Sequence, residues 1–219
     1  MLSKREGIQM AKQIEGVYES ILACARKEFL EKGYMDASLR TIASEAGTST
    51  NSIYVRFKDK EGLFAAIVEP VSEEFLSRCL NIQETFHGFD SETQKREVGQ
   101  YSGNAMLDMV DYIYEHMEEF RLLLDASYGT RFHNFVDRLV EMEEEYTWKW
   151  LEATGFRMEP EGGMTKEFYH IMVTAYFEGI FEVVRHKMSR EDAKKYVAMM
   201  GKYHHAGFLA IVGEQAPED

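Results

Sequence analysis

The segment 38–62 carries polar and cationic residues at the spacing of a DNA-reading helix pair. Its sequence is SLRTIASEAGTSTNSIYVRFKDKEG. Two short helices joined by a tight turn with glycine form a helix-turn-helix, whose second helix presents its N-terminal residues to the major groove. Residues 50–52 and Arg56 can face outward while Ile53 and Phe57 face the core. Spacing alone leaves a plain helical hairpin open as the alternative.

The same segment also offers groups for phosphate. The amides at a helix start, the Tyr54 hydroxyl and the Lys60 ammonium are all suited to bind phosphate oxygens. Each has an ordinary alternative: Tyr54 can pack between helices, and Lys60 can be a solvated lysine at a helix start. Ser38 and Ser49 are expected to cap helices first and to bind phosphate second.

Groups for catalysis or metal binding are sparse. The sequence has no GxSxG, HExxH or GxxxxGK[ST] motif. His204 and His205 lie about 100° apart on a helix and cannot chelate one ion together. Asp108, Asp111 and Glu115 share a helical face, which we interpret as a solvated acidic stripe rather than a metal or cationic-ligand site, and the run 141–145 as another solvated face. We predict no catalytic residue, metal or cofactor; a metal site built from separate helices stays the alternative.

The hydrophobic pattern predicts helices throughout. Apolar residues recur three and four positions apart, which is the period of an amphipathic helix, and no strand-like alternation is found. Gly33 and Gly47 are expected to end helices, and Pro70 to kink or break one. The predicted helices are 13–32, 39–46, 50–57, one from about 60, and then 96–116, 118–126, 131–154, 165–187 and 190–212.

These helices divide into two predicted domains. Residues 1–58 are expected to form a three-helix bundle with the helix-turn-helix, and residues 59–219 a larger helical domain. The fold class is therefore all-α. At 219 residues the chain can bury a large core without a metal or disulfide staple.

Charge and composition restrict the partners. The net charge is −13, yet residues 1–65 hold ten Lys and Arg against nine Asp and Glu, so all the excess acid lies beyond residue 65. A polyanion can approach the first part and is repelled by the rest. Two cysteines form no disulfide framework, and neither a signal peptide nor a membrane-spanning run is apparent. We expect a cytoplasmic protein without a membrane partner.

The N-terminal region resembles the tetracycline-repressor (TetR) family of bacterial transcription regulators over about residues 14–66. The matching positions are Gly33-Tyr34, residues 38–43, Ala46-Gly47-Thr48-Ser49, Ile53-Tyr54 with Phe57, and residues 60–64. The rest of the chain resembles the family in length and helical layout only. The resemblance implies a homodimeric regulator that binds double-stranded DNA at a palindromic operator and responds to a small-molecule effector.

The resemblance assigns DNA contacts residue by residue. Asn51 stands where the family often has a small residue, and Val55 where a polar or aromatic one is usual. Asn can read adenine and Val can contact a thymine methyl, so DNA binding is retained while the operator sequence stays open. The predicted DNA-binding residues are Ser38, Thr48, Ser49, Thr50, Asn51, Ser52, Tyr54, Val55, Arg56 and Lys60.

The larger domain is rich in Met, Phe, Tyr and Trp, which suit an adaptable apolar pocket and equally a plain core. The resemblance implies that some of them line an effector pocket. The predicted pocket residues are Met106, Met109, Tyr112, Phe120, Phe135, Trp148, Met172 and Tyr176.

The last two predicted helices are apolar nearly all round, so one face of each needs a partner. A two-fold four-helix interface satisfies both faces, and the resemblance implies the same mode of dimerisation. The predicted interface residues are Ala175, Gly179, Val183, Met200, Gly207 and Phe208.

The whole pattern predicts a ligand-responsive regulator, most simply a repressor released by a largely apolar effector. An anionic effector is disfavoured because the domain is acidic, and a cationic amphiphile fits if Asp108 or Glu115 faces inward. The alternatives are an all-helical protein that binds an apolar ligand without binding DNA, and a helical metal-dependent enzyme.

Overall fold

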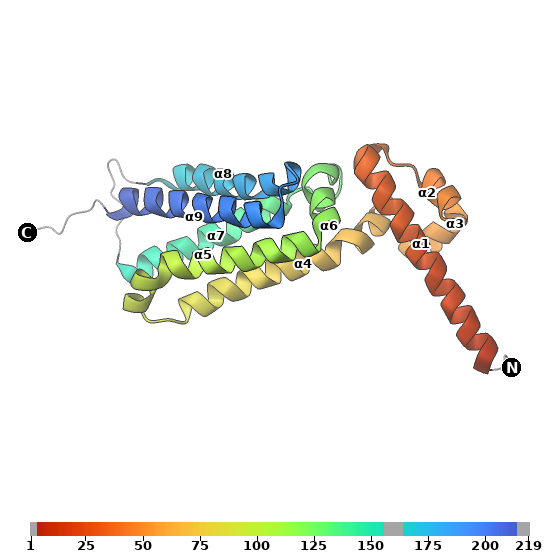
Figure 1. The fold of residues 1–219 in the computed structure, drawn as a ribbon, viewed down its shortest axis with the longest axis horizontal. Helices are drawn as coiled ribbons and strands as arrows, with labels where there is room; N and C mark the ends of the chain where they lie inside the picture. The colour runs from red at the N-terminus through yellow and green to blue at the C-terminus, as the bar shows by residue number, and fades with distance from the viewer. Residues whose placement is uncertain (1–3, 156–163, 214–219) are drawn as a thin grey trace, which may run out of the picture. The chain divides into compact units, whose positions relative to one another are not determined.

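The computed structural model describes residues 4–155 and 164–213, with side chains described for 15–155 and 164–212. All regular structure in these residues is helical (Figure 1). The elements are α1 Lys4–Asp36, α2 Leu39–Glu45, α3 Thr50–Phe57, α4 Lys60–His87, α5 Ser91–Glu115, α6 Met117–Arg121, the π-helix η1 Leu122–Ala126, α7 Phe135–Thr154, α8 Lys166–Arg185 and α9 Arg190–Gly213. The all-α fold class is confirmed.

The chain forms two compact units. Of the described residues, 4–72 and 118–133 belong to one unit, and 73–117, 134–155 and 164–213 belong to the other. This division differs from the functional domains 1–58 and 59–219 expected from the sequence, and that expectation stays a prediction.

Aromatic and aliphatic side chains hold the first unit together. Phe29 of α1 and Phe64 of α4 are fully buried and meet edge to face at 5.1 Å between ring centroids. Ile42 of α2 and Ile53 of α3 are also fully buried. The short helices α2 and α3 are too short to be stable alone, so this core fixes them.

Local capping sets the ends of α2 and α3. The Ser38 and Ser49 hydroxyls accept hydrogen bonds from the amides of Thr41 (3.3 Å) and Ser52 (3.2 Å), as the sequence predicts for N-caps. Gly47 has φ of 64°, a left-handed conformation that favours glycine and turns the chain from α2 into α3.

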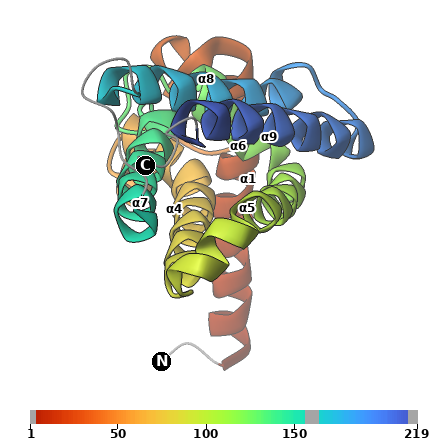
Figure 2. The same cartoon turned by 90° about the vertical axis from the view of Figure 1, so that its left-hand side faces the viewer.

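In the second unit, α5 contacts α7 and α9, and α8 contacts α7 and α9. Figure 2 shows α8 and α9 lying across one side of this unit, with α7, the later half of α4 and α5 on the other side. Phe75 of α4, Phe135 of α7 and Phe181 of α8 meet with ring centroids between 5.8 and 6.3 Å apart. This aromatic cluster joins three helices that are distant in the sequence.

Helices α4 and α5 differ from the sequence prediction in ways that have a physical cause. Helix α4 continues through Pro70, because Val68, Val71 and Ser72 on either side are buried and their packing outweighs the cost of the proline, about 3 kcal/mol. Helix α5 begins at Ser91 rather than 96, because the Asp90 carboxylate accepts from the Thr93 amide (3.0 Å) and caps it. The Thr93 hydroxyl also donates to Asp90, at 2.7 Å, and the two hydrogen bonds together lower the pKa of the Asp90 carboxyl.

The first helix also differs from its predicted bounds. Helix α1 starts at Lys4, earlier than predicted, and Gly33 interrupts its helical geometry with φ of 71° as expected. Among the described helices, none combines the length and the apolar character needed to cross a membrane.

Candidate DNA interface and ligand cavity

Helix α3 turns one face to the core and another to solvent. Ile53 and Phe57 are buried, whereas Tyr54 is 52% exposed and Val55 is 75% exposed. Asn51 at the helix start is exposed as well. A valine so exposed contributes nothing to the core, and this placement agrees with its predicted role on a DNA-reading face.

The side chain of Arg56 on α3 is fixed by hydrogen bonds within the helix. Its guanidinium donates to the Ser52 carbonyl at 3.2 Å and also to the Ser52 hydroxyl. An arginine bonded to the residue one turn earlier is pre-ordered on the helix surface, and its other N–H groups remain donors.

Lys60 has a structural partner that the sequence did not reveal. Its ammonium donates to the carbonyls of Met35 and Ala37, both at 2.9 Å, and lies 4.8 Å from the centroid of the Tyr34 ring. Desolvation lowers its pKa. Lys60 therefore ties the start of α4 to the end of α1, and a phosphate contact would use its third proton.

The rest of the predicted DNA set lies at the N-terminal ends of α2 and α3 and in the turn that joins them. Ser38 and Ser49 are the N-caps described above, and Thr48 and Thr50 are half-buried at the turn. The prediction omitted Arg40 of α2 and Lys58 at the end of α3, both exposed cations on this unit. Their charge was visible in the sequence, but their direction was not.

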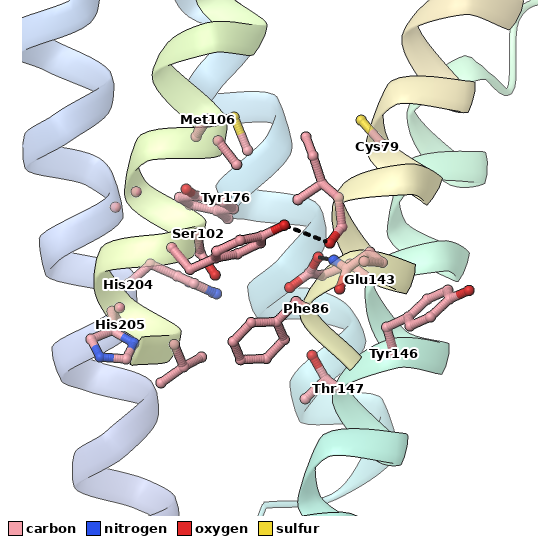
Figure 3. Close-up of a pocket in the computed structure, with 18 of the residues that line it drawn as sticks. Cys79, Phe86, Ser102, Met106, Glu143, Tyr146, Thr147, Tyr176, His204 and His205 are labelled. Carbon is pink, nitrogen blue, oxygen red and sulfur yellow. Dashed lines mark hydrogen bonds between the residues drawn. The ribbon is translucent and has the colours of Figure 1, made fainter. Parts of the chain in front are cut away.

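The second unit encloses a cavity of about 510 Å³. Its walls come from α4, α5, α7, α8 and α9, as the close-up in Figure 3 shows. Its lining includes eight Phe, Tyr and Trp residues: Phe86, Tyr101, Tyr146, Trp150, Tyr169, Tyr176, Phe177 and Phe208.

Glu143 of α7 places a carboxyl group in this wall. The residue is half-buried, and its Oε2 accepts a hydrogen bond of 2.7 Å from the Gln83 amide of α4. Burial raises the pKa of Glu143 to about 7, and the hydrogen bond from Gln83 opposes that shift. The sequence interpretation of residues 141–145 as a solvated face is wrong for this residue.

Other polar cavity groups are driven toward their neutral forms. The His204 ring stacks on Tyr176 at 4.3 Å, and burial lowers the pKa of both His204 and His205. Burial raises the pKa of Tyr176, and the Glu143 charge raises it further. The thiol of Cys79 has its pKa raised to about 12 by burial, with Glu143 as a second cause.

The predicted pocket residues separate into two groups. Met106, Met109 and Tyr176 line the cavity. The others lie outside its lining: Phe120 and Phe135 are fully buried in the packing, Tyr112 is buried beside Arg78, Trp148 packs on Tyr169, and Met172 is half-buried. Periodicity identified apolar faces, but it cannot tell which of them borders a void.

The acidic stripe of α5 does not face the cavity. Asp111 pairs with Arg190 (2.7 Å) and Lys194 (2.6 Å) of α9, which lower its pKa. Glu115 lies 3.7 Å from Arg190, and Asp108 is exposed. Among the described residues no cluster of potential metal ligands is found.

The predicted interface residues are also divided. Val183 is fully buried, and a Cβ on Gly179 would lie 2.8 Å from Met200 Cε, so these three pack within the unit. Phe208 lines the cavity, while Ala175 and Gly207 are exposed. Helices α8 and α9 also expose large apolar side chains that are not among the six predicted interface residues: Phe168, Ile171, Met199, Tyr203 and Ile211.

Comparison with known families and sequences identifies the N-terminal region. Residues 21–67 match the family described as "Bacterial regulatory proteins, tetR family". The chain is similar to the uncharacterized HTH-type transcriptional regulators YvdT (42% identity over 60 residues, 27% of this chain) and YerO (30% over 82 residues, 37% of this chain), both of Bacillus subtilis strain 168. These matches span 31% and 28% of the two relatives, about a third of their length.

Comparison with solved structures extends the similarity in fold to most of the chain. SmeT, the repressor of the Stenotrophomonas maltophilia multidrug efflux pump SmeDEF, is 20% identical with a TM-score of 0.58, covering 87% of this chain and 89% of SmeT. NalD, the secondary repressor of the MexAB-OprM multidrug efflux pump of Pseudomonas aeruginosa, is 22% identical with a TM-score of 0.57, covering 87% and 96%.

Proposed function

We propose a function from one premise: the chain belongs to the tetR family of bacterial regulatory proteins. It is a DNA-binding transcription regulator with a helix-turn-helix, and this membership bears out the prediction that it is not an enzyme. We propose that it acts in the cytoplasm as a homodimeric repressor. In this proposal a small, largely apolar effector enters the cavity and the protein releases a palindromic operator.

The observation that carries DNA binding is the outward face of α3. Val55 and Tyr54, each more than half exposed, lie on the same helix as the exposed Asn51 and the pre-ordered Arg56. Hydroxyl, amide, methyl and guanidinium groups together on one short helix suit direct readout of base edges and phosphates. Ser38, Thr48, Ser49, Thr50, Ser52 and Lys60 complete the proposed contact set.

The effector class is inferred from the cavity walls. Burying about 300 Å² of an apolar ligand gains on the order of 7 kcal/mol before ordering costs, at roughly 25 cal/mol per Å². SmeT has also been solved in a complex with triclosan, an observation that concerns SmeT alone but fits an aromatic effector here. Met106, Met109 and Tyr176 are the proposed contacts that the sequence also predicted.

Dimerisation is supported by the outer face of α8 and α9. Ile171 is 63% exposed and Tyr203 is 76% exposed, and the exposed small residues Ala175 and Gly207 follow each of them one turn later on the same helix. A self-complementary patch on two helices pairs naturally about a two-fold axis. We propose that these residues, rather than Gly179 and Val183, form its centre.

Release is proposed to be a shift in population. An effector that binds only the conformation with an open cavity favours that conformation by its differential affinity. If the two recognition helices of that dimer no longer match successive major grooves, about 34 Å apart, operator affinity falls.

The test starts from the full chain and DNA. Selection from a random-sequence pool should enrich a palindrome, and the DNA upstream of the chain's own gene should give a mobility shift. A screen of apolar, cationic and anionic compounds by thermal shift should then find ligands that also release the DNA. If no sequence is enriched from the pool, the repressor proposal is rejected in favour of the alternative, a ligand-binding protein that does not bind DNA. Stabilisation and release by sugars or phosphorylated compounds alone would contradict the proposed effector class.

A further inference from the structure

The cavity has one feature that an apolar ligand alone does not use. Among the described residues that line it, Glu143 is the only carboxylate and Lys202 the only lysine or arginine. Lys202 is exposed, so water solvates its charge, whereas Glu143 is half-buried and is bonded to Gln83. The cavity therefore contains a single shielded site where charge can be placed.

Aromatic groups surround this carboxyl. The Glu143 charge affects Tyr169 and Tyr176 of α8 and Cys79 of α4, so all three lie near it. Tyr146 lies one turn further along α7, and the cavity also contains Trp150 and Phe86. Figure 3 shows Glu143 between the α4 side and Tyr176. Ring faces carry negative potential and attract cations, so they act in the same direction as the carboxylate.

We propose that the effector is a lipophilic cation, an apolar body bearing one ammonium group, and that Glu143 pairs with that ammonium. This inference rests on the proposed function, because it names the chemical class of the effector that the cavity takes. Asp108 and Glu115, the carboxylates that the sequence offered for this role, lie outside the cavity lining.

The proposal follows from the cost of a carboxylate in an apolar wall. An ionised carboxyl group with few partners is unfavourable there, which is why burial raises the pKa of Glu143 to about 7. A bound cation supplies the missing partner and restores the ionised form. An anion meets repulsion from the same group, and a neutral ligand gains only a hydrogen bond.

The neighbouring titratable groups do not compete for this role. Burial lowers the pKa of His87, His204 and His205 and raises that of Tyr169, Tyr176 and Cys79, so these groups are held uncharged near neutral pH, where cation binding is tested. The titratable or charged groups in the lining are Cys79 and His87 from α4, Tyr101 from α5, Tyr146 from α7, Tyr169 and Tyr176 from α8, and Lys202, His204 and His205 from α9.

The experiment compares two ligands of the same shape. (Naphthylmethyl)trimethylammonium and neopentylnaphthalene differ only in a charged nitrogen against a neutral carbon. In calorimetry with the wild-type full chain at pH 8, the cation should bind at least tenfold more tightly. At pH 7, repeated in buffers of different ionisation enthalpy, its binding should release about half a proton, because Glu143 is then about half protonated.

Variants locate the effect. Glu143→Gln keeps the shape and an acceptor for Gln83, and should lose at least tenfold in cation affinity and all proton release, with the neutral ligand unchanged. Glu152→Gln, an exposed site on the same helix, should alter nothing. Far-ultraviolet circular dichroism checks folding, and the wild-type comparison decides even if Glu143→Gln does not fold.

Equal affinity for the two ligands, or a Glu143→Gln variant that retains the cation preference, would overturn the cationic class. Operator release is measured separately by fluorescence anisotropy. Protein that prefers the cation but binds no DNA would contradict the repressor proposal and support the cationic ligand class. Protein that releases DNA with the neutral ligand alone would support the repressor proposal and contradict the cationic ligand class.

Discussion

The outward face of α3 and the wall of the cavity use polar groups in opposite ways. On α2 and α3, serine and arginine side chains bond to residues three or four positions away, as in the pairs Ser49–Ser52 and Arg56–Ser52, and the face is open to water. In the cavity, Glu143 meets Gln83, which is 60 residues away, in an apolar setting. The exposed face suits recognition that salt weakens, whereas the shielded carboxyl suits recognition that salt hardly affects.

The largest expected effect is therefore a salt dependence confined to DNA binding. A dimer with about six to ten phosphate contacts should lose about 10³- to 10⁵-fold in operator affinity between 50 and 200 mM salt. The cationic naphthyl probe, bound at a shielded carboxyl, should lose less than about threefold over the same range. Titrations by anisotropy for DNA and by calorimetry for the probe measure both slopes. Parallel slopes would remove the distinction between the two sites.

The next effect concerns the dimer that presents two α3 helices together. Ile171→Glu puts a charge at the centre of the proposed two-fold interface, facing its own copy, and should raise the dimer dissociation constant at least about a hundredfold. Operator affinity should fall with it, while cavity binding persists within each chain. Sedimentation velocity measures the assembly.

Asn81→Glu is the matched control for the dimer, since it adds the same charge at an exposed position of α4. It should leave sedimentation unchanged. Wild-type protein that is monomeric at micromolar concentration, or an Ile171→Glu variant that stays dimeric, would reject this interface.

A smaller effect follows from the raised pKa of Glu143, about 7 in the folded chain against an ordinary value of 4.5. Between these values the unfolded chain releases the Glu143 proton before the folded chain does. The Glu143 contribution to the free energy of unfolding therefore falls as pH rises from about 4.5 to 7. Relative to wild type, Glu143→Gln should gain about 1–3 kcal/mol of stability between pH 5 and pH 8.

Urea unfolding at the two pH values measures this gain. Glu152→Gln, exposed on the same helix, should show no such pH-dependent difference. A wild-type-to-variant difference that is flat with pH would mean that Glu143 is not shielded from water.

The same contrast explains what the sequence can predict. Apolar spacing, the caps Ser38 and Ser49 and the turn at Gly47 depend on residues within one or two helical turns, so helices α2 and α3 and their exposed face were predictable. Glu143 looked like one more acid in a charged run, because its surroundings come from helices far apart in the sequence. The structural contacts of Lys60 were missed for the same reason, since its carbonyl partners lie 23 and 25 residues earlier.

The smallest effects separate phosphate contacts from base contacts on α3. Tyr54→Phe removes one exposed hydroxyl and should weaken binding about fivefold, or about 1 kcal/mol, on every DNA sequence, because phosphates carry no sequence information. Val55→Thr keeps the shape but replaces a methyl by a hydroxyl, and should change preference at one base pair by a similar factor while general affinity stays the same. Both side chains are more than half exposed, so neither change disturbs the core. Lys60→Ala is the less informative variant, since it also frees the carbonyls of Met35 and Ala37.

Anisotropy on the selected operator, on single-base variants of it and on unrelated DNA measures the effects of Tyr54→Phe and Val55→Thr. An altered base preference in Tyr54→Phe, or a uniform loss in Val55→Thr, would exchange the two roles and reverse the orientation of α3 on DNA.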